Sequence, residues 1–183
     1  MFPLSLAKQA GEELGRRLVS NIKIIELIPV GSVRRKAASI KDLDFLVVVK
    51  TIPKQITLEL SKKRIGIVED ICAPKSSAVR HVTSVLRLKT GTSTKSVKVD
   101  FFVCTPKEKP FMLFHYTGSR AYNIRTRANA KRKKWKLNQY GLYHISNDPS
   151  QQKHVRNSSR IKTEKDLAKF LGVSYRLPEN RIN

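Results

Sequence analysis

The chain has 183 residues, a length that fits one domain or two small lobes, and 40% of its residues are hydrophobic. That composition excludes a disordered basic tail, and no apolar run approaches the roughly 18 residues of a membrane-spanning helix. Its 37 Lys and Arg residues against 14 Asp and Glu give a net charge of +23, which predicts a polyanionic partner. Nucleic acid is the first candidate for that partner, and an anionic membrane surface is the second.

The N-terminal residues and the cysteines predict an intracellular protein. Residues 1–10 hold one Lys and no small-residue cleavage site, so we expect no signal peptide. The two cysteines, Cys72 and Cys104, cannot form a four-ligand metal site and fit a reducing compartment. A single disulfide between them stays open as an alternative.

Hydrophobic spacing and turn residues predict the elements of the first half of the chain. Residues 44–49 form a nearly continuous apolar run, which is typical of a strand covered on both faces. The predicted elements, in order, are an amphipathic helix over 4–20, a strand over 22–30, a short helix capped by Ser32, the buried strand over 44–49, a helix from Pro53 to about residue 63, and strands over 83–89 and 95–104.

After Pro106 the predicted segments become helical and rich in basic residues. The predicted elements after it are helices over 107–116 and 119–134, short strands around 137–143, a polar loop over 146–159, and a helix that begins with a capping box of Thr163 and Asp166 and ends at Gly172. Strands and helices without strict alternation favour an α+β fold. We therefore predict a mixed α/β lobe over residues 1–105 and a smaller, basic α/β lobe over residues 106–183.

The second lobe concentrates positive charge. Between Lys109 and Thr163 the only acid is Asp148, and aromatic residues are interleaved with the cations. This pattern is typical of nucleic-acid binding, although a merely solvated basic face is the alternative for such a run. Of the aromatic residues, Trp135 and Tyr140 can either stack on bases or pack within the protein. The residues predicted to contact DNA are Arg120, Arg125, Lys131, Arg132, Lys133, Lys134 and Lys136.

Three carboxylates in a chain poor in acids predict a metal site. Asp42 and Asp44 stand at the start of an apolar strand, where the period of two puts both side chains on one face. Asp100 lies in a second apolar strand, and we expect antiparallel pairing to bring it against the first two. Three such carboxylates can hold two divalent cations for in-line attack on phosphorus, whereas a lone Asp at a strand end is commonly a turn residue or a helix cap. His81 lacks the spacing of a metal ligand, and we expect it on the surface or in a loop.

Gly31 and Ser32 stand where the predicted strand over 22–30 meets the short helix. Backbone N–H groups at such a turn bind phosphate, and the Ser32 hydroxyl adds a further donor. Arg34 and Arg35 follow directly, and the forked donors of arginine clamp phosphate oxygens. A phosphate cradle, cationic clamps and carboxylates within residues 31–44 predict a nucleotidyl-transfer site.

These motifs resemble the family X DNA polymerases of the nucleotidyltransferase superfamily, and most of all a small viral member of that family. The similar segments are Gly31-Ser32-x-Arg34-Arg35 followed by Asp42-x-Asp44 and Asp100, then Tyr116-Thr117-Gly118-Ser119 with Asn123 and Arg127, then Leu137-Asn138-Gln139-Tyr140-Gly141-Leu142, and the terminal segment from Thr163 to Arg181. The resemblance covers essentially the whole chain. It implies a nucleotidyltransferase palm with a mixed sheet and flanking helices in residues 1–105, and a nucleotide- and DNA-binding lobe in residues 106–183. Because only about 30 residues precede Gly31, we expect no N-terminal lyase domain.

The resemblance also implies roles for individual residues. Asp42, Asp44 and Asp100 are expected to be catalytic and to hold two Mg²⁺ ions, for which Mn²⁺ can substitute. The residues implied in nucleotide binding are Gly31, Ser32, Arg34, Arg35, His115, Tyr116, Gly118, Asn123 and Arg127. Two positions depart from the family pattern: His115-Tyr116 replaces Tyr-Phe, and Arg120 stands where an acid is common. The first departure leaves sugar selection and fidelity open.

The sequence therefore predicts a template-directed DNA polymerase that fills short gaps in base excision repair. Its expected substrates are dNTPs and gapped or nicked duplex DNA, and we expect a monomer without a membrane partner. A DNA ligase and an abasic-site endonuclease are further candidate partners, and the expected location is the virion or infected-cell cytoplasm if the protein is viral. Two alternatives stay open: a template-independent or RNA-directed nucleotidyltransferase, and a non-catalytic DNA-binding architectural protein.

Overall fold

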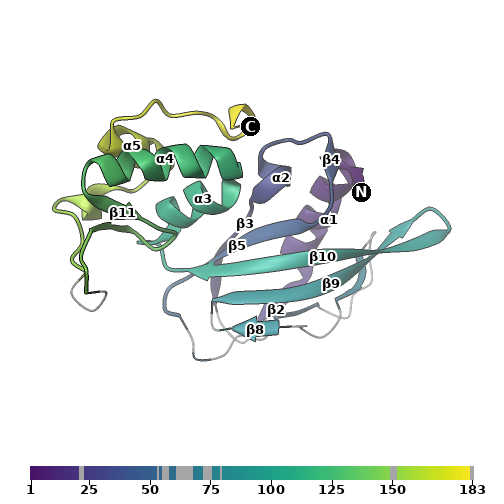
Figure 1. Ribbon diagram of the computed structural model, residues 1–183. Helices are drawn as coiled ribbons and strands as arrows, with labels where there is room; N and C mark the ends of the chain where they lie inside the picture. The colour runs from purple at the N-terminus through teal and green to yellow at the C-terminus, as the bar shows by residue number, and fades with distance from the viewer. Residues whose placement is uncertain are drawn as a thin grey trace. The chain divides into compact units, whose positions relative to one another are not determined.

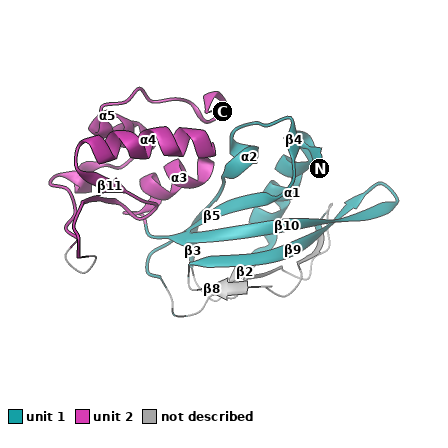
Figure 2. Cartoon of the chain, viewed as in Figure 1, with its two compact units in different colours: residues 1–105 teal, residues 106–183 magenta. Residues whose placement is uncertain are grey.

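The computed structural model describes residues 1–20, 23–52, 54, 58–60, 68–71, 76–78, 80–148 and 152–181. The chain divides into two compact units, residues 1–105 (unit 1) and residues 106–183 (unit 2), as Figure 2 shows. Each unit has a buried apolar cluster of its own. In the described parts of the chain, no helix is both long and apolar enough to cross a membrane.

Unit 1 is built on one mixed sheet (Figure 1). Its hydrogen-bonded strands follow the order β3-β5-β10-β9-β7, and β8 pairs with β9 off this path. The strand bounds are Ile24–Pro29 for β3, Leu43–Val49 for β5, Val68–Ile71 for β7, Ser76–Ala78 for β8, His81–Thr90 for β9 and Ser93–Cys104 for β10. The pair of β5 and β10 is parallel and the other pairs are antiparallel, which confirms the predicted α+β fold with a mixed sheet.

The centre of the unit 1 core lies on β5 and β10. Residues 45–49 are buried without alternation, because apolar groups cover both faces of β5, as the apolar run predicted. Phe45 of β5 stacks on Phe101 of β10 with 5.8 Å between ring centroids. Helix α1, Leu4–Arg17, packs on this layer, and a Cβ placed on its Gly11 would lie 3.3 Å from the Phe45 ring.

Short elements complete unit 1, and two of them correct the predictions. They are α2, Gly31–Arg34, and two antiparallel pairs, β1 (Phe2–Pro3) with β4 (Ser39–Ile40) and β2 (Leu18–Ser20) with β6 (Leu58–Leu60). The helix predicted over 4–20 ends at Arg17 because the residues after it pair as β2. The helix predicted from Pro53 is wrong at residues 58–60, where pairing with β2 overrides local helix propensity. Pro53 itself, 55–57 and 61–63 lie outside the described residues.

Unit 2 is largely helical. In its described residues the elements are α3 (Lys109–Thr117), α4 (Arg120–Arg132), the antiparallel pair of β11 (Trp135–Leu137) and β12 (Leu142–His144), α5 (Glu164–Leu171), and the 3₁₀ turns η2 (Ser158–Arg160) and η3 (Pro178–Asn180). The predicted capping box is present at α5, where the Thr163 hydroxyl accepts a hydrogen bond from the Asp166 N–H at 3.0 Å and the Asp166 carboxylate accepts one from the Thr163 N–H at 2.9 Å. The helix ends, as predicted, at Gly172, whose φ of 71° is in the left-handed region.

Arg181 fixes the C-terminal segment inside unit 2. Its side chain is fully buried and donates a hydrogen bond to a Glu164 carboxylate oxygen at 2.7 Å. Its guanidinium lies 5.0–5.5 Å from the ring centroids of Phe114, Tyr122 and Tyr175. A carboxylate and aromatic faces together offset the cost of burying the charge. The terminal motif of the sequence is therefore a packing element of the unit 2 core.

Candidate active site

Asp44 and Asp100 lie side by side on neighbouring strands of unit 1. Strands β5 and β10 run parallel, and Asp44 pairs directly with Asp100 in their register. Residues paired in this way present their side chains to the same face of the sheet. The antiparallel pairing that we expected is therefore wrong, because β10 pairs with β9 as a hairpin and meets β5 with its other edge, in the same direction. The two carboxylates nevertheless meet.

The electrostatics of Asp44 indicate a crowded site. The pKa of Asp44 is raised from 3.8 to about 6, first by burial and then by repulsion from Asp42 and Asp100. Attraction to Lys98 and Arg35 opposes this rise without cancelling it. The three predicted carboxylates therefore lie close enough together for Asp42 and Asp100 to act on the charge of Asp44, although burial is the largest cause of its raised pKa.

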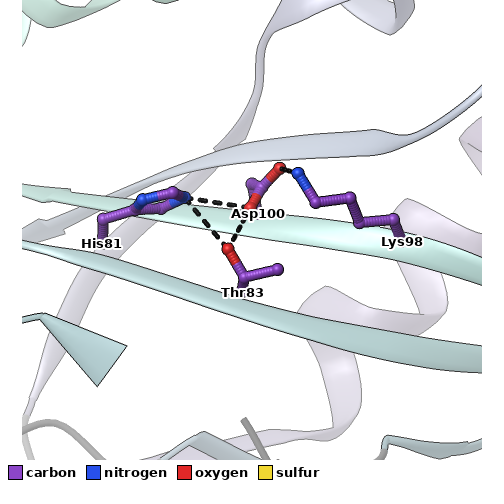
Figure 3. Close-up of polar contacts among 4 residues, drawn as sticks. All are labelled: His81, Thr83, Lys98 and Asp100. Atoms are coloured by element: carbon purple, nitrogen blue, oxygen red, sulfur yellow. Dashed lines mark hydrogen bonds and ion pairs between the residues drawn. The ribbon is translucent and has the colours of Figure 1, made fainter. Parts of the chain in front are cut away.

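Three side chains contact the Asp100 carboxylate (Figure 3). The Lys98 ammonium lies 2.5 Å from Oδ2, and the Thr83 hydroxyl donates to Oδ1 at 2.5 Å. The His81 Nε2 lies 2.9 Å from the same Oδ1. Burial alone favours the neutral acid, but these hydrogen bonds outweigh it and hold the pKa of Asp100 below its ordinary value. Asp44 and Asp100 are thus neighbours whose pKa values move in opposite directions.

The sequence analysis did not identify these three partners of Asp100. His81 lies in β9 rather than in a loop, and its side chain is 43% exposed, as expected for a surface residue, with its ring stacked on Phe102 at 4.7 Å. The antiparallel register of β9 and β10 places Thr83 opposite Asp100. A signal was present in the sequence, since Gly91 is a turn residue and counting outward from it pairs residue 83 with residue 100.

Gly31 brings the loop after β3 against Asp44. The Val30 N–H donates to the Asp44 carbonyl oxygen at 2.8 Å, and Gly31 has a φ of 58°. A Cβ on Gly31 would collide with the Asp44 carboxylate. Glycine is therefore required here both for its backbone conformation and for the close approach.

Ser32 does not cap the short helix as predicted. Helix α2 begins two residues earlier than such a cap requires, with Val30 in the N-cap position and without a side-chain cap, because the chain already turns at Gly31. The Ser32 Oγ is buried and has no hydrogen-bond partner within the part of the chain that the structure describes. A buried hydroxyl left without a partner costs about 1–3 kcal/mol, so it suits an acceptor supplied by a ligand. Arg34 and Arg35 are half-buried beside it.

The nucleotide-binding residues predicted in unit 2 gather around His115. The Asn123 side-chain amide donates to the His115 carbonyl oxygen at 2.7 Å, and the Arg127 guanidinium donates to the His115 Nδ1 at 2.8 Å. Burial lowers the pKa of His115 to about 4, and the charge of Arg127 contributes in the same direction, so the ring is neutral near pH 7. Tyr116 meets this ring edge-on at 4.7 Å. A small hollow at this point is lined by Phe111, Phe114, His115, Asn123, Arg127, Leu137 and Asn138.

The cations predicted to bind DNA lie on α4 and directly after it. All seven are exposed: Arg120, Arg125, Lys131, Arg132, Lys133, Lys134 and Lys136. Lys133 differs from the others, because its ammonium lies 5.3 Å from the centroid of the Trp135 ring. Trp135 in turn packs against Phe170 with 5.5 Å between ring centroids, which favours packing within the unit over base stacking for this residue.

Gly118, with a φ of 72°, separates α3 from α4.

A metal site formed from His, Cys, Asp and Glu is not preassembled in the described residues, where no three of these side chains gather closely enough to hold an ion. The carboxylates of Asp42, Asp44 and Asp100 repel one another, and Lys98 occupies one oxygen of Asp100. Oxygen donors of this type nevertheless suit a hard divalent cation, which would also relieve the repulsion of Asp44 by Asp42 and Asp100. Cys104 is buried, and Cys72 lies outside the described residues, so their relation stays open.

Comparisons with known proteins identify the family. A family model described as the DNA polymerase beta thumb matches residues 112–182. The chain belongs to the family X DNA polymerases. It is 32% identical over 165 residues to the repair DNA polymerase X of African swine fever virus, strain Badajoz, and the match covers 88% of this chain and 85% of that protein. In a second African swine fever virus isolate, from a South African tick, the protein of the same name is 33% identical over 100% of both chains.

More distant relatives share the fold. The DNA polymerase/3′-5′ exonuclease PolX of Bacillus subtilis is 28% identical over 141 residues, which are 77% of this chain and 23% of that protein. A ternary complex of Leishmania infantum polymerase beta superposes with a TM-score of 0.70 at 18% identity, covering 100% of this chain and 77% of the other. The resemblance inferred from the motifs is confirmed.

Proposed function

We propose that this chain, a DNA repair polymerase of family X, fills short gaps by two-metal transfer of a nucleotide from a dNTP to a primer 3′-hydroxyl. The observation that carries the proposal is the direct pairing of Asp44 with Asp100, together with the raised pKa of Asp44. Carboxylates crowded in this way favour divalent cations as counter-ions. The names of the viral relatives and the gap complex of Leishmania polymerase beta support gapped DNA as the substrate.

Asp42, Asp44 and Asp100 would hold two Mg²⁺ ions, with Mn²⁺ as a substitute. Such ions, when bound, lower the pKa of a hydroxyl nucleophile and stabilise the charge that develops at phosphorus. The protein's own contribution is to keep the Asp100 carboxylate ionised and oriented. Thr83 and Lys98 do so by occupying one oxygen each.

The triphosphate is proposed to lie against Gly31 and Ser32. The unpaired Ser32 hydroxyl offers a hydrogen-bond donor, and Arg34 and Arg35 supply positive charge. Arg35 is half-buried, and burial lowers the pKa of its guanidinium. Attraction to Asp44 opposes this effect.

In unit 2 the base of the nucleotide is proposed to contact His115 and its neighbours. The neutral His115 ring accepts a hydrogen bond from Arg127, and Asn123 binds the His115 backbone carbonyl, so the ring offers an aromatic face for stacking; Tyr116 and Gly118 border it in sequence. Contacts from Asn123 or Arg127 to minor-groove acceptors would test the shape of a base pair, because these acceptors look nearly alike in every pair. Template identity is then read by the pairing itself.

The exposed cations of unit 2 are proposed to bind the phosphates of duplex DNA. Such binding releases counter-ions, so its affinity falls steeply with salt. Filling a one-nucleotide gap leaves a nick, and we place an abasic-site endonuclease before this step and a DNA ligase after it. The viral relatives favour the infected-cell cytoplasm or the virion as the location, and the chain is proposed to act as a monomer.

Extension of a labelled primer on a one-nucleotide-gapped duplex tests the proposal. Each dNTP is offered alone with Mg²⁺, and we expect the template base to decide which one is incorporated. The variant Asp100→Asn keeps the shape of the side chain and one oxygen acceptor, which can serve Thr83 and His81, while its amide nitrogen cannot accept from Lys98. It is expected to fold and bind DNA but not to extend the primer. Glu12→Gln, an exposed carboxylate on α1, is the matched control and should extend like the wild type.

Each outcome of this experiment assigns the protein to a class. Addition that ignores the template would contradict gap filling and support a template-independent nucleotidyltransferase. Tight DNA binding without any addition would support an architectural protein. Extension by Asp100→Asn at the wild-type rate would remove Asp100 from the metal site.

A further inference from the structure

Lys98 stands out because it is a cation placed directly on a carboxylate that the proposed function assigns to metal binding. We propose that Lys98 is a built-in counter-ion, which holds Asp100 before a divalent cation arrives and competes with that cation for the carboxylate. The inference rests on the proposed function for its metal. Lys98 is thereby added to the proposed metal site as a residue that sets its affinity for the divalent cation.

The geometry of β10 creates the contact. Lys98 and Asp100 are two residues apart in one strand, so their side chains rise from the same face. The flexible lysine stem lets the ammonium fold back along the strand and reach Oδ2 at 2.5 Å. The Asp100 side chain is 7% exposed and that of Lys98 is 53% exposed, so the lysine is the partner that can leave into water.

Both oxygens of Asp100 are already in use. Oδ1 accepts from Thr83 and contacts His81, whereas Oδ2 contacts Lys98 (Figure 3). Thr83 and His81 are fixed by the register of β9, directly across from β10. A cation that binds Oδ2 must therefore displace the lysine rather than the other two partners.

The charge of Lys98 acts on the whole carboxylate group. The ammonium contacts Asp100 directly, and Asp42 and Asp44 also attract it. Lys98 thus offsets part of the repulsion among the three acids while no other cation is bound. It also lowers the affinity of the same acids for a divalent cation, because the positive ammonium repels a second positive charge that binds the same carboxylates.

Mn²⁺ binding to the DNA-free protein, followed by electron paramagnetic resonance, tests the inference without any catalytic readout. Two unit charges about 4 Å apart interact by about 1 kcal/mol even in water, so Lys98→Met is expected to bind Mn²⁺ at least about fivefold more tightly. Lys98→Arg keeps the charge and should return the affinity towards that of the wild type. An unchanged or weaker affinity in Lys98→Met would overturn the inference.

Lys89→Met is the matched control. Lys89 carries the same charge on the same face of the hairpin, but it lies six residues from Thr83 along β9, about 20 Å at about 3.3 Å per residue. That distance exceeds the Debye length of about 10 Å at 0.1 M salt, so removing this charge should leave Mn²⁺ affinity unchanged. An equal gain in Lys89→Met would assign the effect to net charge and overturn the role of Lys98.

Asp100→Asn separates a failure of this inference from a failure of the proposed function. If Asp100→Asn weakens Mn²⁺ binding and Lys98→Met does not tighten it, the metal site stands and only the role of Lys98 is wrong. If Asp100→Asn binds Mn²⁺ like the wild type, the metal assignment itself fails, and the inference falls with it. In the Asp100→Asn background, Lys98→Met is expected to lose most of its effect.

Discussion

The raised pKa of Asp44 predicts that this residue lowers the stability of unit 1 in the absence of metal. The folded state ionises Asp44 only near pH 6, whereas the unfolded chain ionises it at its ordinary value of 3.8. Between these two values the folded state binds more protons than the unfolded state, so its stability falls as the pH rises. The cost is small below pH 4 and reaches its full value above pH 6.

The size of the effect follows from the shift. Each pKa unit corresponds to about 1.4 kcal/mol, so a rise of about two units costs about 3 kcal/mol at pH 8 and about half of that at pH 5. Asp44→Asn removes the charge and keeps the shape of the side chain. We therefore expect unit 1 of this variant to be about 3 kcal/mol more stable than the wild type at pH 8, while the variant loses primer extension.

The assay must report on unit 1. Trp135, the single tryptophan, lies in unit 2, so its fluorescence does not follow β5 and β10. Hydrogen–deuterium exchange of the β5 and β10 amides in a metal-free buffer does, and a gain of about 3 kcal/mol slows their exchange about 100-fold. Glu12→Gln is the control for the loss of one negative charge. Exchange that is not slowed in Asp44→Asn at pH 8, or a gain equal at pH 5 and pH 8, would refute the reasoning.

Two further predictions concern unit 2. Lys131→Met should reduce the slope of log affinity for duplex DNA against log salt by about 0.9. Lys133→Met should change this slope less, because the Lys133 ammonium lies over the ring of Trp135. Anisotropy titrations at several salt concentrations measure both slopes, and equal reductions in the two variants would contradict the distinction. In NMR titrations, His115 should titrate near pH 4, because burial and the charge of Arg127 both disfavour its protonated form, and Arg127→Met should raise its pKa without reaching 6.5. A wild-type His115 that titrates near 6.5 would refute this assignment.

Elements whose signals are local were predicted well. The apolar run over 44–49 identified β5, and the Thr163 and Asp166 capping box marked the start of α5, because each signal involves only neighbouring residues. Pairing direction is different, since the side-chain pattern of a strand is the same in parallel and antiparallel sheets. For that reason the sequence placed Asp100 in a strand near Asp44 but predicted the wrong direction for the pair.

The site was predicted where it depends on motifs and missed where it depends on register. Asp44 and Asp100 follow from the motif, and the structure pairs them directly. Thr83 and His81 reach Asp100 only because the hairpin turns at Gly91, and a shift by one residue would turn both to the other face. The helix prediction for residues 58–60 was wrong for a related reason, because this strand forms by pairing with β2, which is distant in the sequence.

The order of strands also explains why two neighbouring aspartates behave in opposite ways. Asp100 lies on β10, which has β9 along its other edge, and β9 supplies the hydroxyl of Thr83 and the ring of His81. Asp44 lies on β5, whose other neighbour is β3, and there the carboxylate meets Gly31, which carries no side chain. Donors therefore reach Asp100 from a neighbouring strand, whereas the Asp44 carboxylate packs directly against a glycine that offers it no side chain. The neighbours that each strand order supplies thus keep Asp100 ionised to a lower pH than Asp44.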